Sequence, residues 1–206
     1  MVHFALNLED RLPATFTAPG LDEAKFLALC EEFPDCTLEY TTDGTVIVMP
    51  PTDPENSIRV AEVVGQLWLR ARENGLGHVI GPDGGFFLPR GSRRSPDAAW
   101  FDDRRWKEAK RPDLRYPVFA PEFVIEVRSP HDRPRLLREK MDDYMANGVQ
   151  LAWLIDPIER TVTIYRPGRE PEILTNPASV AGEGPVTGFV LKLDRVLGAG
   201  TDHSRS

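Results

Sequence analysis

A strand, a helix and a second strand follow one another in the middle of the chain, and this succession constrains the fold most strongly. The segment EFVIEV (residues 122–127) is a near-continuous apolar run of the kind that is buried on both faces of a sheet. A helical pattern from about Asp132 to Asn147 ends at Gly148, and the strand-like segment QLAWLID (residues 150–156) follows. This spacing predicts a right-handed crossover between two parallel strands.

The remaining patterns make the chain a mixed α/β protein. Residues 21–33 and the charged segment near Asp103 have helical periodicity, and an apolar stripe from Val60 to Ala71 predicts a long helix that packs on a sheet. Strands are expected in a hairpin over residues 36–51, with its turn at Asp43-Gly44, and in the short runs GHVIG, GFFLP, PDAAWF and TVTIYRP. We predict an N-terminal extension with a helix (residues 1–35), one main domain (residues 36–196) and a disordered tail (residues 197–206).

Composition narrows the functional classes. No apolar run approaches the roughly 20 residues that a membrane helix needs, and the N-terminus lacks the features of a signal peptide. We therefore expect no membrane association and a cytoplasmic location, with Cys30 and Cys36 as reduced thiols. The net charge of -7 argues against nucleic-acid binding by bulk charge alone. Four arginines near two acidic residues, Arg90, Arg93, Arg94 and Arg128, could still supply local positive potential.

Two carboxylates lie within these apolar segments. Asp97 stands near the start of the strand PDAAWF, and Glu126 stands between Ile125 and Val127. A buried carboxylate must be neutralised, paired or given a metal, because an unpaired buried charge is very costly. Two acids on neighbouring strands suit a hard cation such as Mg²⁺ or Mn²⁺, which one or two carboxylates hold together with waters and phosphate oxygens. Asp97 could instead be an ordinary turn residue after Pro96.

A lysine occupies the apolar face of the helix that follows Glu126. With Leu136 as origin and about 100° per residue, Lys140 falls at about 40°, between Leu136 and Tyr144. Its ammonium could reach the sheet beside Glu126, where it could orient the attacking water and stabilise charge in a phosphodiester transition state. Alternatively, its stem could cover the core while its ammonium reaches water.

The ordered segments SPDAAWF, PEFVIEVRSPHD, EKMDDYMANGV, AWLIDP and VTIYRPG resemble the Uma2 family of the PD-(D/E)XK restriction-endonuclease-like superfamily. The resemblance runs from about residue 36 to 193. It implies a mixed β-sheet flanked by helices, with Pro96-Asp97 and Glu126 as the two acidic parts of the motif. The usual lysine two residues after the second acid is here Arg128, which cannot act as a general base, so the resemblance assigns that role to Lys140.

Three further residues are accessory candidates beside Arg128. Glu39 lies in the first hairpin, where relatives also look acidic, and could line the same cleft or stand on a surface strand. Asn56 lies on the apolar face of the long helix, near a position where many relatives have histidine, and could support the metal ligands. Ser129 could cap a turn or donate a hydrogen bond to Glu126.

These features predict an endonuclease or phosphodiesterase that depends on Mg²⁺ or Mn²⁺, with Asp97 and Glu126 as metal ligands and Lys140 as a catalytic group. Its expected partner is nucleic acid, DNA in preference to RNA, and a homodimer or higher homo-oligomer is expected. Two alternatives remain open from the sequence. The chain could be a binding or regulatory module that keeps the fold without the chemistry, or a self-associating structural protein whose acids form ion pairs.

Overall fold

The protein was analysed as a computed structural model, which describes residues 12–74, 77–110 and 118–198. Its centre is a six-stranded sheet with one parallel pair among the described strands, β8 (Phe123–Val127) and β9 (Leu151–Asp156). Helix α4 (Pro134–Ala146) joins these two strands, in the predicted strand-helix-strand order. In spatial order, its strands are β11 (Glu172–Thr175), β10 (Thr161–Tyr165), β9 (Leu151–Asp156), β8 (Phe123–Val127), β7 (Ala98–Phe101) and β4 (His78–Ile80).

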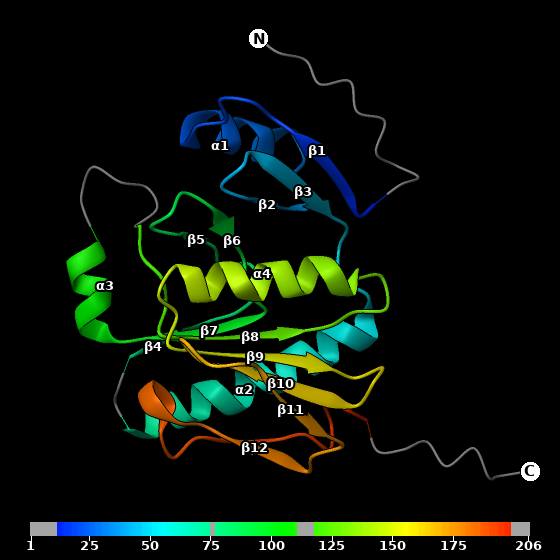
Figure 1. Ribbon diagram of the computed structural model, residues 1–206, viewed down its shortest axis with the longest axis vertical. Coiled ribbons are helices and arrows are strands. Elements are labelled where there is room, and N and C mark those ends of the chain that lie inside the picture. The colour runs from blue at the N-terminus through cyan, green and yellow to red at the C-terminus, as the bar shows by residue number, and fades with distance from the viewer. Residues whose placement is uncertain (1–11, 75–76, 111–117, 199–206) are drawn as a thin grey trace, which may run out of the picture.

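A five-stranded sheet lies above the central sheet in Figure 1. Its strands, in spatial order, are β1 (Ala14–Thr17), β3 (Thr45–Met49), β2 (Thr37–Tyr40), β6 (Arg93–Arg94) and β5 (Phe86–Phe87). The hairpin of β2 and β3 turns at Gly44, whose φ of 82° lies in the region that favours glycine. Strands β12 (Ser179–Ala181) and β13 (Val190–Lys192) form a further pair near the short η1 helix (Gly184–Val186).

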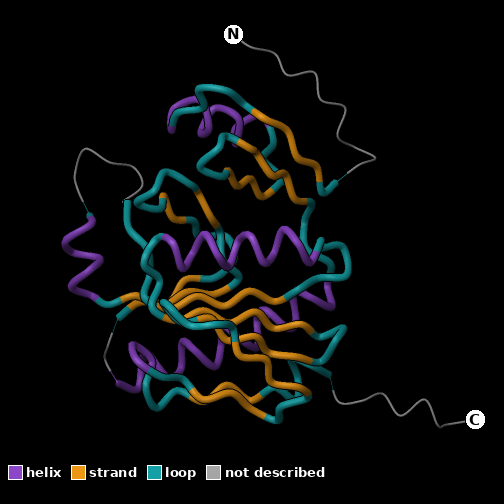
Figure 2. Tube along the Cα trace, in the orientation of Figure 1, coloured by secondary structure: helices purple, strands orange, loops and turns teal. Residues whose placement is uncertain are grey.

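Helices cover both faces of the central sheet. The long helix α2 (Pro54–Asn74) packs on one face, while α4 (Pro134–Ala146) lies on the other, between the two larger sheets (Figure 2). Helix α1 (Glu23–Glu32) covers the N-terminal sheet, and α3 (Asp103–Ala109) follows β7. The Asp22 side chain caps α1 by accepting a hydrogen bond from the Lys25 amide, which satisfies one of the free donors at a helix start.

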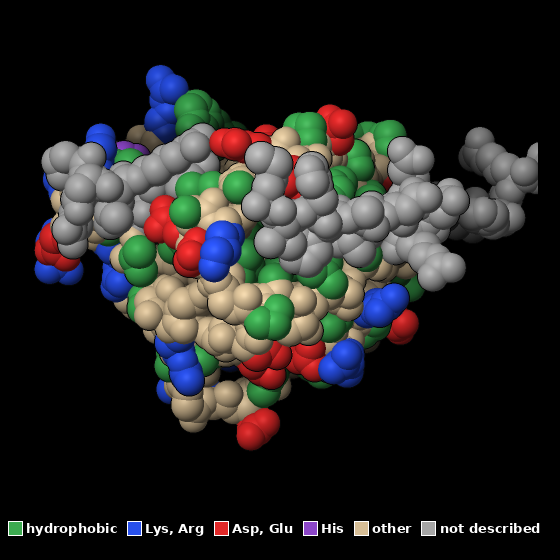
Figure 3. Space-filling view, turned by 90° about the horizontal axis from the view of Figure 1, so that it is seen from above, with side chains coloured by type: hydrophobic (Ala, Val, Ile, Leu, Met, Phe, Trp, Pro, Cys, Tyr) green, Lys and Arg blue, Asp and Glu red, His purple; other side chains and the backbone are tan. Residues whose placement is uncertain are grey.

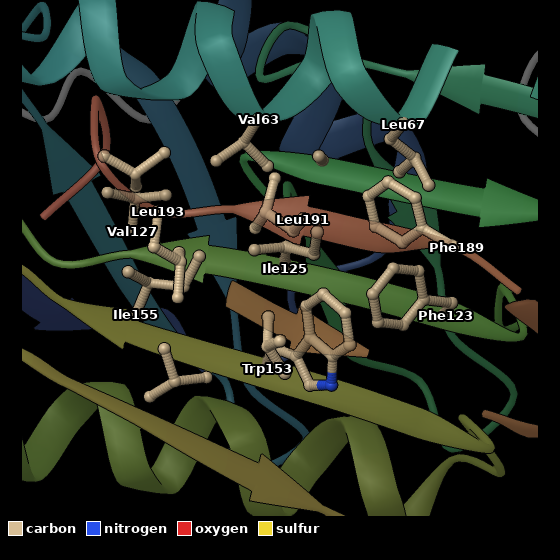
Figure 4. Close-up of a cluster of buried hydrophobic side chains, with 14 of the residues drawn as sticks. Val63, Leu67, Phe123, Ile125, Val127, Trp153, Ile155, Phe189, Leu191 and Leu193 are labelled. Carbon is tan, nitrogen blue, oxygen red and sulfur yellow. The ribbon is translucent and has the colours of Figure 1, made fainter. Parts of the chain in front are cut away.

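Alternation along β8 decides which side chains face each helix. Ile125 and Val127 pack toward α2 in one apolar cluster, together with Trp153 and Phe189 (Figure 4), whereas Val124 packs toward α4 in another. Burying each such side chain stabilises the fold by about 1.5–3 kcal/mol. Because side chains alternate, Glu126 must face the same side as Val124, toward α4.

The structure confirms most of the predicted elements. The hairpin, the apolar stripe of α2, the strands β7 to β10 and the helices near 21–33 and Asp103 are all present, and α4 begins at Pro134, two residues after the expected start. The prediction missed five strands, β1, β6, β11, β12 and β13. Strand β1 pairs with β3 and so joins part of the N-terminal segment to the five-stranded sheet. The tail beyond residue 198 lies outside the described residues, and the proposed domain boundaries stay a prediction.

Candidate active site

Glu126 and Lys140 meet in the layer between the central sheet and α4. The Lys140 amine donates a hydrogen bond to Glu126 Oε2 at 2.9 Å and lies 2.8 Å from Oε1. It also donates to the Ser95 carbonyl oxygen at 3.0 Å. Lys140 is 8% exposed and Glu126 is 3% exposed, so the lysine reaches into the protein and does not extend its amine to solvent. The inward position that helical periodicity indicates is the one observed.

Glu39 brings a carboxylate from the other sheet to the same lysine. Its Oε1 lies 2.8 Å from the Lys140 amine and also accepts a hydrogen bond from the Ser95 amide at 2.8 Å. Its Oε2 accepts from Arg94 at 3.2 Å, and Arg94 also donates to Asp143 on α4 at 2.7 Å. Glu39 is 1% exposed. It is therefore a buried member of the cluster and not a surface strand residue.

Tyr144 is a site residue that the sequence analysis missed. Its hydroxyl group donates a hydrogen bond to Glu126 Oε1 at 2.8 Å from one helical turn beyond Lys140. The signal was present, because residues four apart on a helix share a face. A tyrosine on an apolar face is usually taken for core, and Tyr144 does pack in the core with its ring.

Asp97 lies directly before β7, beside the end of β8. Its Oδ2 accepts a hydrogen bond from the Val127 amide at 2.7 Å, while Oδ1 has no hydrogen-bond partner among the described residues. The residue is only partly buried, unlike Glu126. One carboxylate oxygen is thus fixed by the sheet, and the other remains available for a ligand.

A cleft of about 140 Å³ joins these groups to the surface. Asp97, Glu126, Glu39 and Lys140 line it from the two sheets and α4, and the exposed Arg133 lines it at the start of α4. Such a volume holds several water molecules. The carboxylates therefore face an accessible polar space.

Burial and neighbouring charges give the three acids of the site different pKa values. Burial raises the pKa of Glu126 to about 8, with Asp97 and Glu39 adding to the shift and the Lys140 ammonium opposing it. Burial likewise raises the pKa of Asp97 to about 6, again against the effect of Lys140. Burial also tends to raise the pKa of Glu39, but the charges of Lys140 and Arg94 outweigh this effect and hold that pKa below its usual range.

The cation and the phenol of the site keep their protons. Burial alone would lower the pKa of Lys140, but the carboxylates of Glu126, Glu39 and Asp97 outweigh it and raise that pKa above its ordinary value. Burial and then the charge of Glu126 raise the pKa of Tyr144 well above its ordinary value. Both groups therefore act as hydrogen-bond donors to Glu126 at neutral pH. Lys140 suits charge stabilisation and the orientation of water better than proton abstraction.

The other accessory residues occupy different places. Asn56 lines the cleft and is 4% exposed. Ser129 also lines the cleft, but its amide donates to Asp132 at 2.7 Å, and no hydrogen bond joins it to Glu126 in the described part of the chain. Arg128 donates to Asp156 at 2.6 Å on the neighbouring strand β9. The arginine at the usual lysine position is therefore held in a separate ion pair.

The prediction that Arg94 contributes to a basic surface around the two acids is wrong. This residue is 3% exposed and binds Glu39 and Asp143, so it cannot dock a nucleic-acid strand. Arg93 is partly buried and donates to the Leu38 carbonyl oxygen at 2.7 Å. On the face seen in Figure 3, acidic and basic side chains are interspersed, and the described residues form no continuous basic area there. Consecutive arginines in a sequence are usually exposed to solvent, but strand β6 directs the Arg94 side chain toward the interior.

The residues fit a hydrated divalent ion better than a fully protein-coordinated one. Within the described residues, no group of three or more His, Cys, Asp or Glu side chains is placed to hold a metal. Asp97 nevertheless offers a free oxygen to the cleft, and Mg²⁺ needs only one or two carboxylates because it keeps several of its waters. Asp97 and Glu126 would hold the ion, which would polarise a phosphoryl oxygen or activate water.

Together, the layered sheets and the acid-lysine cluster beside the start of β7 and the end of β8 place the protein in the restriction-endonuclease-like class of mixed α/β folds. The chain belongs to the Uma2 family, whose model, described as "Putative restriction endonuclease", matches residues 23–194. The chain is similar in structure to a protein described as a "putative nuclease belonging to DUF820" from Anabaena variabilis ATCC 29413. The TM-score is 0.70 at 23% identity, over 84% of this chain and 96% of the other, which shows a shared fold. No curated protein matches the sequence.

Proposed function

We propose that the protein is a nuclease that hydrolyses phosphodiester bonds of nucleic acid with the help of Mg²⁺ or Mn²⁺. The observation that carries this proposal is the position of Lys140, whose amine bonds Glu126 beside Asp97 in one open cleft. Two carboxylates, an ammonium and room for water are the groups that metal-assisted phosphodiester hydrolysis needs. The family description as a restriction endonuclease supports DNA in preference to RNA.

The roles follow from the geometry. Asp97 and Glu126 would hold the ion, and the Lys140 ammonium would stabilise the negative charge that builds up on the phosphate in the transition state. Tyr144 and Glu39 are positioning residues, because Tyr144 holds Glu126 and Glu39 holds Lys140. Arg128 takes no part in this scheme, since it bonds Asp156.

Cleavage assays test the proposal. Purified protein is incubated with single- and double-stranded DNA and RNA, with Mg²⁺, with Mn²⁺ and with a chelator. We expect metal-dependent cleavage that Lys140→Met abolishes while Mn²⁺ binding persists, and folding of the variant is checked by circular dichroism. Absence of cleavage and of salt-dependent binding for every substrate would overturn the proposal.

A non-catalytic binding module is the second candidate. It is favoured by the internal pairing of the cluster, in which Glu126 already holds Lys140 and Tyr144, and Glu39 holds Arg94 and Lys140. Such a module would bind nucleic acid without metal-dependent cleavage.

Homo-oligomer formation also stays a prediction, and light scattering coupled to size-exclusion chromatography checks it. In the described part of the chain, no helix is long and apolar enough to cross a membrane.

A further inference from the structure

Two oxygen atoms in the wall of the cleft lack a hydrogen-bond partner. Asp53 precedes α2, and its Oδ1 accepts a hydrogen bond from the Asn56 amide at 3.0 Å, which caps the helix. Its other oxygen, Oδ2, and the Asn56 side-chain oxygen Oδ1 are both buried and have no hydrogen-bond partner among the described residues. Both residues line the cleft that contains Asp97 and Glu126, and Asn56 is 4% exposed.

Leaving a buried acceptor unpaired costs about 1–3 kcal/mol, and native proteins rarely tolerate it without a reason. Here two such acceptors, one of them on a carboxylate, lie within one helical turn and border the same polar space. They require hydrogen-bond donors from a ligand or from water. A donor that is also positively charged, or bound to a positive ion, suits the pair best because of the Asp53 charge.

The charges of the cleft favour a cation over a phosphate as that ligand. Lys140 is already shared between Glu39 and Glu126, and Arg94 is shared between Glu39 and Asp143. Asp53 and Asp97 have no cationic side chain of their own within ion-pair distance in the described chain. These two carboxylates attract a metal ion more strongly than a metal-free phosphate, even though the exposed Arg133 also lines the cleft.

We propose that Asp53 and Asn56 form an outer acceptor pair, which accepts hydrogen bonds from water molecules of a hydrated divalent ion held by Asp97 and Glu126. The inference rests on the proposed function; it adds Asp53 to the site and gives the accessory candidate Asn56 a specific role. An ion with only two protein carboxylates keeps most of its waters, and their protons need acceptors. Asp53 and Asn56 are thus positioning residues that orient the hydration shell.

Two variants remove the acceptors without removing the helix cap. Asp53→Asn keeps one capping oxygen and puts an amide donor in place of Oδ2. Asn56→Leu replaces the second acceptor with an apolar group of similar size. Glu55→Gln is the matched control, because Glu55 lies in the same helical turn and the change removes one negative charge, yet Glu55 does not line the cleft.

Mn²⁺ affinity is measured by calorimetry without nucleic acid, and melting temperature is measured on the metal-free proteins. We expect Asp53→Asn and Asn56→Leu each to weaken Mn²⁺ binding about 10–100-fold. Glu55→Gln should bind as the wild type does. The metal-free Asn56→Leu variant should melt at or above the wild-type temperature, because it replaces an unpaired buried acceptor with an apolar group. Asp53→Asn exchanges its unpaired acceptor for an amide donor, so only its Mn²⁺ affinity is compared.

Four results would overturn the inference. Unchanged Mn²⁺ affinity in both variants would do so and would leave the proposed function intact, provided that the wild type binds Mn²⁺. A lower melting temperature of metal-free Asn56→Leu would show that the Asn56 oxygen already has a structural partner. Weaker binding of a metal-free oligonucleotide, with unchanged Mn²⁺ affinity, would assign the pair to the nucleic acid. A wild-type protein that binds no Mn²⁺ would reject the proposed function itself, and this inference with it.

Discussion

Lys140 on α4 and Glu126 on β8 are joined directly, with the lysine amine 2.9 Å from Glu126 Oε2 in a nearly solvent-free layer. The same amine lies 2.8 Å from Glu39 on the other sheet. This single ammonium group therefore links a helix and two sheets. It is the cation that compensates Glu126, and it shares Glu39 with Arg94.

Replacing Lys140 by Met should destabilise the protein as well as inactivate it. Removing one partner of a buried ion pair typically costs about 3–5 kcal/mol, because the remaining charge stays buried. We expect a loss of this size in the free energy of unfolding near pH 8, measured by urea denaturation, and a smaller loss near pH 4.5, where the carboxyl groups take up protons. The exposed Glu139→Gln on the same helix is the control. Equal stability of Lys140→Met and wild type at both pH values would contradict the claim that the buried ion pairs of Lys140 stabilise the fold.

Arg128→Lys should not rescue Lys140→Met. Arg128 occupies the position where the superfamily motif usually has its lysine, but its guanidinium bonds Asp156 at 2.6 Å on β9. A lysine introduced there would meet the same carboxylate. We expect the double variant to be as inactive as Lys140→Met in the metal-dependent cleavage assay. Recovery of cleavage would show that the site can use either position.

Mn²⁺ affinity should rise with pH up to about 8. Burial raises the pKa of Glu126 to about 8 and that of Asp97 to about 6, so at lower pH a proton competes with the ion for each carboxyl. Calorimetry in buffers of different ionisation enthalpy should detect protons released on binding near pH 7 and few near pH 9. An affinity that stays constant between pH 6 and 8 would contradict these shifts.

The two arginines that line the cleft among the described residues should differ in their effects. Arg94 is buried between Glu39 and Asp143, so Arg94→Ala should lower the free energy of unfolding by about 3–5 kcal/mol. Arg133 is exposed at the cleft, so Arg133→Ala should weaken oligonucleotide binding and reduce its salt slope by about 1, with stability unchanged. Urea denaturation and binding titrations at several salt concentrations distinguish the two. A salt-slope change in a fully stable Arg94→Ala would contradict the burial of that residue.

Local sequence patterns were enough to predict that Lys140 and Glu126 meet in the site. Helical periodicity places Lys140 on the inner face of α4, and a carboxylate between Ile125 and Val127 must lie inside the sheet, so their meeting follows from the strand-helix order. The main elements were predictable for the same reason. Strands such as β11 were missed because their side chains are mostly exposed and leave little apolar pattern.

The rest of the site depends on contacts between distant segments. Glu39 reaches Lys140 only because the N-terminal sheet packs over α4, and no local pattern shows this. Arg94 turns inward because Glu39 and Asp143 are there to receive it, so its burial could not be predicted from a run of arginines. The unpaired oxygens of Asp53 and Asn56 likewise become evident only when the cleft is formed.

Mn²⁺ binding to the wild type and to Asp97→Asn, compared by calorimetry near pH 8, tests the central claim most directly. The asparagine keeps an oxygen for the Val127 amide and removes the charge that faces the cleft, so the fold should persist. We expect one bound ion in the wild type and a loss of at least about tenfold in affinity in the variant, within the range expected for a weakened metal site. Equal Mn²⁺ affinity in the two proteins, or no binding to either, would contradict a metal site at Asp97 and Glu126.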